Sequence, residues 1–298
     1  MKVKKPRAFA AGFLLLASLA LSACNNRTIL EPTLPTVTPT LAPTPTETPI
    51  PAALSVNGEQ VSQANFDAEL ARYQAAQSAL GKTVSPADAT QAVRADLINT
   101  LLLAQGAAGY KYVVDDATLQ SRLEALATQT GGPAALTAWE TAHGYTDQSF
   151  RQDLRRQIAA AWMRDQVIAS VPTTAEQVHV KQILLYNSDE AQSVLNQLQA
   201  GADFNALAAQ YDPQAHGELG WFPRGYLAEP ALEEAAFALQ PGQHSAVVQT
   251  ELGYHILLVV ERDPARPLSP DALLTLQERA IQDWLLQRQK ESAITPAP

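Results

Sequence analysis

The chain has 298 residues, of which 46% are hydrophobic, and a formal net charge of −9. This length allows one large domain or two to three small ones, and the hydrophobic content excludes a wholly disordered protein. The single cysteine excludes an intramolecular disulfide, a cysteine-rich zinc site and a thioredoxin-type cysteine pair. The acidic balance without a basic stripe argues against general nucleic-acid binding, because phosphate backbones would repel such a surface.

The N-terminus has the pattern of a secretory signal. A basic segment, residues 2–7, precedes an apolar run over residues 8–21 that is too short to span a bilayer comfortably. The sequence Leu21-Ser22-Ala23-Cys24 that follows resembles the bacterial lipobox. This resemblance implies cleavage before Cys24 and a diacylglyceryl group on its thiol. We therefore predict a signal peptide over residues 1–23 and a lipid anchor on Cys24. An ordinary signal peptide with a chance cysteine is the alternative.

Residues 24–52 form the predicted lipidated N-terminus and linker. Proline and threonine are interleaved from Pro32 to Pro51. Proline removes backbone donors and fixes φ, so this segment is expected to be a stiff polyproline-II-like spacer. Such a spacer would hold a folded domain away from the membrane.

The first globular part, residues 53–172, is predicted to be helical. An Asn-Gly turn at residues 57–58 indicates a small entry hairpin, and Ser62 is a candidate N-cap for the helix that follows. Ser85-Pro86 opens a long segment with helical apolar spacing, because proline is tolerated in the first turn. Further helices are predicted over about 115–129, 133–142 and 147–169.

The segment that follows has a different pattern. A β-branched and aliphatic run over residues 178–185 indicates a buried strand. Two amphipathic helices are then predicted, over 189–200 and 203–210, followed by a glycine-rich turn over 217–222. A further helix is predicted over 233–239, and two more strands around 245–248 and over 253–259. These elements describe a compact α+β module.

Three motifs in this module together resemble the parvulin family of peptidyl-prolyl isomerases. They are Gly217-Glu218-Leu219-Gly220-Trp221-Phe222, Glu233-Glu234-Ala235-Ala236-Phe237 and Gln249-Thr250-Glu251-Leu252-Gly253-Tyr254-His255-Ile256. With the lipobox and a closing helix at about 270–291, the whole chain resembles the SurA/PrsA class of extracytoplasmic foldases. The resemblance implies an α+β fold with a helical, chaperone-like N-terminal domain. It also implies a parvulin-like domain over 175–263 and a C-terminal helix over 268–293 that packs on the N-terminal domain.

The activity that the resemblance implies is cis–trans isomerisation of the peptide bond before proline. The amide must lose its resonance to rotate, against a barrier of about 18–20 kcal/mol. An apolar, desolvated pocket with hydrogen-bonding groups around the twisted amide lowers that barrier. This chemistry requires no nucleophile, metal or cofactor, so we expect neither a cofactor nor a metal site.

The resemblance also assigns the site residues. Leu227 and Leu232, where the family usually has methionine and phenylalanine, and Phe237 are the expected substrate-binding pocket. His255 and Thr250 are the expected polar catalytic residues. The two leucines keep the pocket apolar.

The chain departs from the family pattern in two places that belong to the expected catalytic set. The first histidine position of the family reads Gln182, and His179 is at an odd offset, which puts it on the opposite face of the strand. An amide can replace a neutral imidazole, but Gln182 equally fits a pocket that has lost activity. The shortened loop over 211–216 leaves Asp212 as its single carboxylate, and we include it as a catalytic candidate.

Two functions therefore remain open from the sequence. The first is a prolyl isomerase and foldase, anchored to the outer face of a bacterial membrane, that acts on unfolded or newly exported polypeptides containing Xaa-Pro bonds. The second is a non-catalytic holdase that keeps the parvulin domain as a scaffold. A structural lipoprotein is a third option, but it leaves the parvulin motifs unexplained. The sequence leaves the clients and the oligomeric state open.

Overall fold

A computed structural model describes residues 51–296 of the chain. The predicted signal peptide, Cys24 and nearly all of the linker lie outside the described residues. The described part combines helices with antiparallel strands, which confirms the predicted α+β class. No helix within residues 51–296 is long and apolar enough to cross a bilayer.

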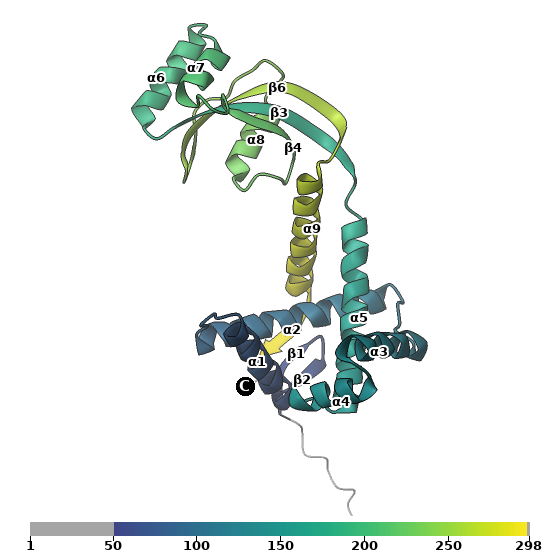
Figure 1. Cartoon of the computed structure of the whole chain (residues 1–298). Helices are drawn as coiled ribbons and strands as arrows, with labels where there is room; N and C mark the ends of the chain where they lie inside the picture. The colour runs from purple at the N-terminus through teal and green to yellow at the C-terminus, as the bar shows by residue number, and fades with distance from the viewer. Residues whose placement is uncertain (1–50, 297–298) are drawn as a thin grey trace, which may run out of the picture. The chain divides into compact units, whose positions relative to one another are not determined.

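The first part of the structure is a helical body (Figure 1). Its helices are α1 (Gln63–Ala79), α2 (Pro86–Gly109), α3 (Asp116–Thr130), α4 (Pro133–Ala142), α5 (Asp147–Ala169) and α9 (Pro270–Glu291). Its small sheet has the order β2-β1-β7, from β1 (Ala52–Val56), β2 (Glu59–Ser62) and β7 (Ile294–Pro296). The body is therefore built from both ends of the described chain.

The local signals for the start of this body are confirmed. Asn57 and Gly58 both have positive φ, 53° and 86°, as the tight turn between β1 and β2 requires. Ser62 caps α1 by accepting the backbone N–H of Asn65. Ser85 caps α2 in the same way, with Pro86 in the first turn. The predicted hairpin and helix starts thus follow from short-range chemistry.

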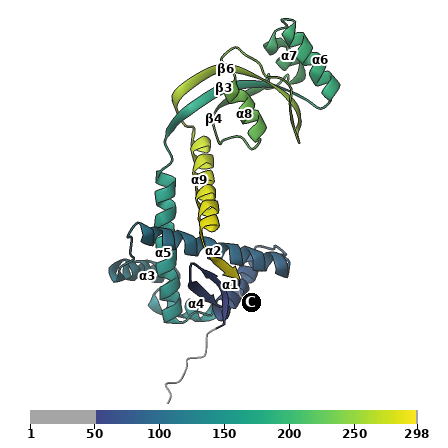
Figure 2. The same cartoon turned by 180° about the vertical axis from the view of Figure 1, so that it is seen from behind.

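Helix α9 packs against α5 and α2; in both views α9 runs alongside α5, and α2 crosses at a steep angle (Figures 1 and 2). Trp284 of α9 contacts two apolar clusters of the body, one around Leu101 and one around Met163. A Cβ atom added to Gly106 of α2 would lie 2.7 Å from the Trp284 ring. The close approach of α9 to α2 therefore depends on a glycine at this position.

The second part, the α+β unit, is built on a sheet of order β4-β3-β6-β5, in which neighbouring strands are antiparallel. Its elements are β3 (Thr174–Leu185), α6 (Ser188–Gln199), α7 (Phe204–Tyr211), β4 (Glu218–Pro223), α8 (Pro230–Ala238), β5 (Val248–Thr250) and β6 (Gly253–Pro267). Figure 1 shows α8 on one side of this sheet and the α6–α7 pair on the other.

The two cores of the unit follow the alternation of side chains along β3. Ile183 and Leu185 pack with α6 and α7. Val178 and Val180 pack with α8 and with Phe222 of β4. Successive side chains of a strand point to opposite faces, so one strand supplies both cores.

One strand position differs from the prediction. A strand was expected around residues 245–248, but β5 covers Val248–Thr250. Residues 243–245 contact β6 only through isolated hydrogen bonds: the Ser245 N–H donates to the Leu257 oxygen at 2.8 Å, and the Ser245 Oγ accepts the backbone N–H of Leu257 at 2.9 Å. The side-chain oxygen thus takes a backbone donor of β6, and a regular ladder begins only at Val248.

The contact between α2 and α9 predicts opposite effects for two glycine substitutions in one helix. Gly106→Ala is expected to lower the free energy of unfolding by about 1–2 kcal/mol, because overpacking against Trp284 outweighs the gain in helix propensity. Gly109→Ala is the matched control. A Cβ there meets nothing within 4 Å, so alanine is expected to be neutral or to stabilise by up to about 1 kcal/mol. Urea unfolding of the two variants measures both. An equal gain in stability in both would contradict close packing at Gly106.

Candidate functional site

The predicted catalytic residues Gln182, His255 and Thr250 form one hydrogen-bonded chain. Gln182 lies on β3, His255 on the neighbouring strand β6, and Thr250 ends β5. His255 Nδ1 lies 2.9 Å from Oε1 of Gln182. On the other side of the ring, Nε2 lies 2.9 Å from Oγ1 of Thr250. The structure therefore brings these three expected residues together.

The partners of the imidazole determine where its proton lies. Oε1 of Gln182 can only accept, so His255 donates its proton from Nδ1. Nε2 is then the acceptor, and the Thr250 hydroxyl donates to it. The Thr250 oxygen in turn accepts the backbone N–H of Leu252 at 3.1 Å. Every group in this chain has a defined direction, which fixes the orientation of a neutral ring.

The surroundings of His255 favour this neutral form. The residue is only 2% exposed. Desolvation by burial lowers the pKa of His255 below its ordinary value of 6.5, and the carboxylate of Glu229 opposes this shift more weakly. At neutral pH the ring is therefore uncharged and can accept a hydrogen bond at Nε2.

Two glycines let the strands approach closely enough to build the chain. A Cβ atom on Gly217, whose φ is +73°, would lie 2.1 Å from the backbone oxygen of Gln182. A Cβ atom on Gly253 would lie 2.5 Å from the backbone oxygen of Leu185. A side chain at Gly253 would push β6, which carries His255, away from β3, and a side chain at Gly217 would push the segment before β4 away from Gln182.

The expected apolar pocket residues lie on the same face of the sheet as His255. Leu257, two residues along β6 from His255, packs in one core with Leu232 and Phe237. Those two side chains are 6% and 4% exposed, so they form the base of this face. Leu227 is half-buried at its border.

The loop that carries Leu227 is held by a carboxylate that the sequence analysis did not identify. Glu233, in the first turn of α8, accepts backbone N–H groups of Gly225 at 2.7 Å, Tyr226 at 3.1 Å and Leu227 at 3.4 Å. Its position near the N-terminus of a helix was the available signal. The backbone groups that it holds depend on the loop conformation, which the sequence pattern does not reveal.

Asp212 lies beside the site, but its carboxylate is used by its own loop. Its two oxygens accept backbone N–H groups of Gln214, Ala215 and Gly217. These hydrogen bonds, those from Ala215 and Gly217 foremost, lower the pKa of Asp212. Asp212 and Gln182 line one hollow of about 440 Å³. Asp212 thus orders the shortened loop at the edge of the site.

His179 is separate from this chain, as its strand offset predicted. Its Nε2 lies 2.5 Å from Oε1 of Glu218, and its ring stacks on Trp221. It does not take the position that Gln182 occupies beside His255. Within residues 51–296, no group of three or more His, Cys, Asp and Glu side chains is placed to hold a metal ion.

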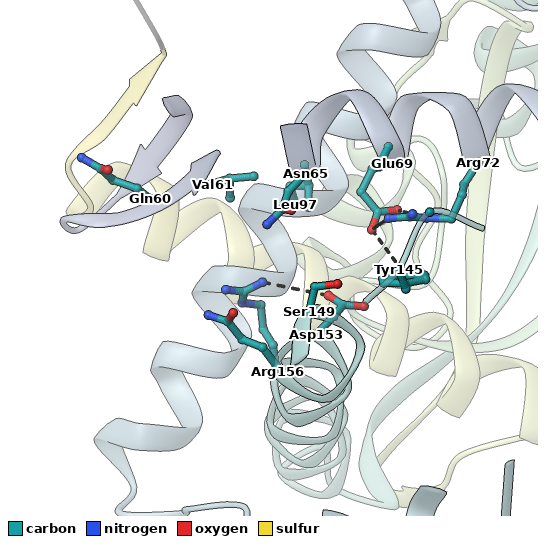
Figure 3. A pocket seen from close by; sticks show the side chains of 13 residues that line it. Gln60, Val61, Asn65, Glu69, Arg72, Leu97, Tyr145, Ser149, Asp153 and Arg156 are labelled. Carbon is teal, nitrogen blue, oxygen red and sulfur yellow. Dashed lines mark hydrogen bonds and ion pairs between the residues drawn. The ribbon is translucent and has the colours of Figure 1, made fainter. Parts of the chain in front are cut away.

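A second polar hollow, in the helical body, has charged walls that pair with each other (Figure 3). Arg72 forms an ion pair with Glu69, and the Tyr145 hydroxyl donates to the same carboxylate at 3.4 Å. Arg156 lies 2.9 Å from Glu59 and 4.0 Å from Asp153. Burial is the main cause of the raised pKa of Asp153. The Arg156–Glu59 pair joins α5 to β2, and the Tyr145–Glu69 hydrogen bond joins α1 to the segment before α5, so these interactions form a structural network.

Comparisons with known proteins match both parts of the chain. Residues 173–261 match the family described as the PPIC-type PPIASE domain, and residues 42–164 match the SurA-like N-terminal domain. The chain is 29% identical over 185 residues to the foldase protein PrsA of a Geobacillus species, covering 58% of this chain and 64% of that protein. It is 35% identical over 92 residues to the peptidyl-prolyl cis-trans isomerase pin4 of Neurospora crassa, covering 28% and 70%.

Among solved structures, the peptidylprolyl isomerase PrsA from Bacillus cereus matches with a TM-score of 0.44 and 21% identity. The match covers 81% of this chain and 86% of that chain. The chain spans less than two thirds of the length of the curated foldases that it matches, for example 34% of one PrsA and 31% of one SurA.

The lowered pKa of His255 predicts a defined loss of stability in acid. As the pH falls below about 6.5, the unfolded chain binds the proton before the folded protein does. The free energy of unfolding should therefore fall from about pH 6.5 down to the folded pKa and then level off, with a slope of at most about 1.4 kcal/mol per pH unit. Titration of the His255 ring by NMR measures the folded pKa directly.

Two variants separate this effect from other titrations. His255→Asn should lose the part of the acid slope that His255 causes. His216→Asn should keep it, because His216 lies in an exposed loop with φ of 53°, which asparagine tolerates. A His255 ring that titrates above pH 6.5 would contradict the desolvated, neutral state.

Proposed function

The chain belongs to the PpiC-type peptidyl-prolyl cis–trans isomerase family, and on this premise we propose that the protein is a foldase that isomerises Xaa-Pro bonds in unfolded polypeptides. The observation that carries the proposal is the hydrogen-bonded chain of Gln182, His255 and Thr250. It lies on the face of the sheet that also carries the apolar residues Leu232 and Phe237.

The mechanism follows from the demands of amide rotation. The planar Xaa-Pro amide loses resonance as it twists, and its nitrogen becomes pyramidal and more basic. An apolar surface at Leu227, Leu232 and Phe237 would hold the proline ring and exclude water. The neutral, oriented His255 ring and its partners supply polar groups without introducing a charge. Interactions that are stronger with the twisted amide than with the planar one lower the barrier.

In this proposal Gln182 acts as a positioning residue. Its Oε1 accepts the Nδ1 proton of His255, which fixes the tautomer of the ring and leaves Nε2 to Thr250. Asp212 has a similar indirect role, because its carboxylate holds the loop beside Gln182. His255 and Thr250 would be the polar groups nearest to the twisted amide. The three apolar residues would contact the proline ring.

We propose a matching division of the chain. Residues 53–172 form a SurA-like helical domain, residues 175–263 form the isomerase domain, and residues 268–293 close the helical domain. The match of residues 42–164 to the SurA-like N-terminal domain supports the first assignment. The packing of α9 on α5 and α2 supports the last.

The proposed location is the outer face of a bacterial membrane. The signal pattern and lipobox support export and lipidation of Cys24, with the proline-rich linker as a spacer. The clients would then be newly exported polypeptides that have yet to fold. Prolyl isomerisation otherwise takes tens of seconds, so catalysis would speed their folding.

A holdase is the second candidate, and one observation in the helical body favours it. A hollow of about 350 Å³ has an apolar wall, whose residues are Leu126, Leu136, Trp139, Phe150 and Leu154. Trp139 is 40% exposed. The apolar wall of such a hollow can hold apolar side chains of an unfolded chain, and this needs no isomerase chemistry.

Exchange NMR on a short Xaa-Pro peptide separates the two candidates. The protein is expected to accelerate cis–trans exchange, and His255→Ala should lower kcat/KM by about tenfold or more, equivalent to about 1.4 kcal/mol of transition-state stabilisation. Gln182→His should retain activity, because an imidazole can also accept the Nδ1 proton of His255.

The control is suppression of the aggregation of an unfolded client, which does not depend on prolyl exchange. A protein that is silent in exchange but active in this assay is a holdase on an isomerase scaffold. Recovery of exchange in Gln182→His would then identify the residue responsible for the lost activity.

The lipid anchor predicts a change of location for one substitution. Cys24→Ser in the bacterial host should release the protein from the membrane fraction and abolish incorporation of labelled fatty acid, because the acylated thiol is lost. Membrane retention of Cys24→Ser without label would show that residues 1–23 act as the anchor.

A further inference from the structure

Strand β3 is covered by β4 along only part of its length. The pairing of these strands runs from Gln177 opposite Pro223 to Lys181 opposite Glu218. One further hydrogen bond follows, from the Gln182 N–H to the Gly217 oxygen at 2.7 Å. β3 nevertheless continues to Leu185, paired with β6 on its other side. Its last residues therefore have a strand on one side only.

The direction of the backbone groups follows from the register. The N–H of Gln182 points toward β4, so the N–H and C=O of Leu184, two residues later, point the same way. The oxygen of Leu185 points toward β6, because Gly253 approaches it closely. Beyond Lys181, β4 no longer pairs with β3. Among residues 51–296, no group hydrogen-bonds to the backbone of Leu184 on this side of β3.

A hollow lies along this free edge. It measures about 440 Å³, and its lining includes Gln182, Leu184, Tyr186, Tyr211, Asp212 and Pro213. Tyr186 is 81% exposed. The loop on the far side is held in place by the three backbone N–H groups that Asp212 accepts. A backbone donor and acceptor therefore face an open space with aromatic walls.

We propose that this free edge of β3 at Leu184 binds an extended segment of an unfolded polypeptide, which pairs with it as an additional strand. Main-chain hydrogen bonds at a sheet edge give affinity without demanding a particular sequence, which suits a foldase with varied clients. The proposal rests on the foldase function and specifies how the client is held.

The free edge of β3 at Leu184 lies beside the proposed catalytic residues. Gln182 lines the hollow and also contacts His255. A segment paired at Leu184 therefore lies next to the hydrogen-bonded chain. Its neighbouring residues would be presented to the apolar face at raised local concentration.

The test is amide hydrogen exchange by NMR on the full protein, with and without an unfolded proline-containing peptide of about ten residues, enough to span a strand. The Leu184 amide should exchange at least about tenfold more slowly with the peptide. The amides of Ile183 and Leu185 face β6 and serve as internal controls, whose exchange should not change.

A pair of substitutions isolates the backbone donor. Leu184→Pro removes the outward N–H and leaves the ladder to β6, whereas Leu184→Ala removes the side chain and keeps the N–H. The proline variant should bind the long peptide about tenfold more weakly than the alanine variant. Should the proline variant fail to fold, the exchange measurement on the unmodified protein decides.

The outcomes distinguish this inference from the proposed function. If a short Xaa-Pro peptide is isomerised but the long peptide leaves Leu184 exchange unchanged, the edge does not bind clients and the isomerase stands. If Leu184 becomes protected while no peptide is isomerised, the edge binds polypeptide and the isomerase proposal fails. Protection that rises with protein concentration alone would overturn the inference in favour of pairing between two copies.

Discussion

The antiparallel pairing of β3 with β6 is the constraint on which both the site and the chain path depend. It extends from Thr174 opposite Pro267 to Leu185 opposite Tyr254. At one end it continues into α5 and α9, which belong to the helical body. At the other end it sets Leu184 opposite His255, so Gln182 is the diagonal neighbour of the histidine. A shift of one residue in the register of β3 and β6 would move Gln182 to the other face of the sheet and remove its hydrogen bond to His255.

The second requirement is a neutral, oriented ring in a site with little water. Burial lowers the pKa of His255, and the acceptor at Gln182 fixes the proton on Nδ1. Both effects need an uncharged partner on β3 that accepts a hydrogen bond. A neutral histidine and a glutamine share this property, although their shapes differ. The departure from the family pattern at Gln182 therefore changes the partner but still provides an acceptor for the Nδ1 proton of His255.

Short-range features of the fold could be predicted from the sequence, because their causes lie within a few residues. The Asn-Gly turn and the serine caps before α1 and α2 are of this kind. The strand β7 was not predicted, since its three residues have no pattern of their own and depend on β1 as a partner. The role of Glu233 was not predicted either, because the N–H groups that it accepts are brought to it only by the conformation of the loop over 225–227.

The site shows the same division. The resemblance predicts His255, Gln182 and Thr250 as site residues, and the structure adds the direction of the hydrogen bonds between them. It also changes the reading of Asp212, because a carboxylate that accepts three backbone N–H groups is committed to its loop. Whether a polar residue is free or committed depends on backbone geometry, which composition and spacing do not encode.

The α+β unit is inserted in the sequence of the helical body, and the β3–β6 pairing reduces the entropic cost of bringing the two parts of the body together. The body is completed by α9 and β7, which follow the unit in the chain and pack on elements that precede it. Joining these parts across an unfolded insertion would require closure of a long loop, which is entropically costly and slow. Once β3 and β6 have paired, Thr174 and Pro267 lie opposite each other. The loop to be closed is then short, so the ladder that builds the site also brings together the two halves of the body.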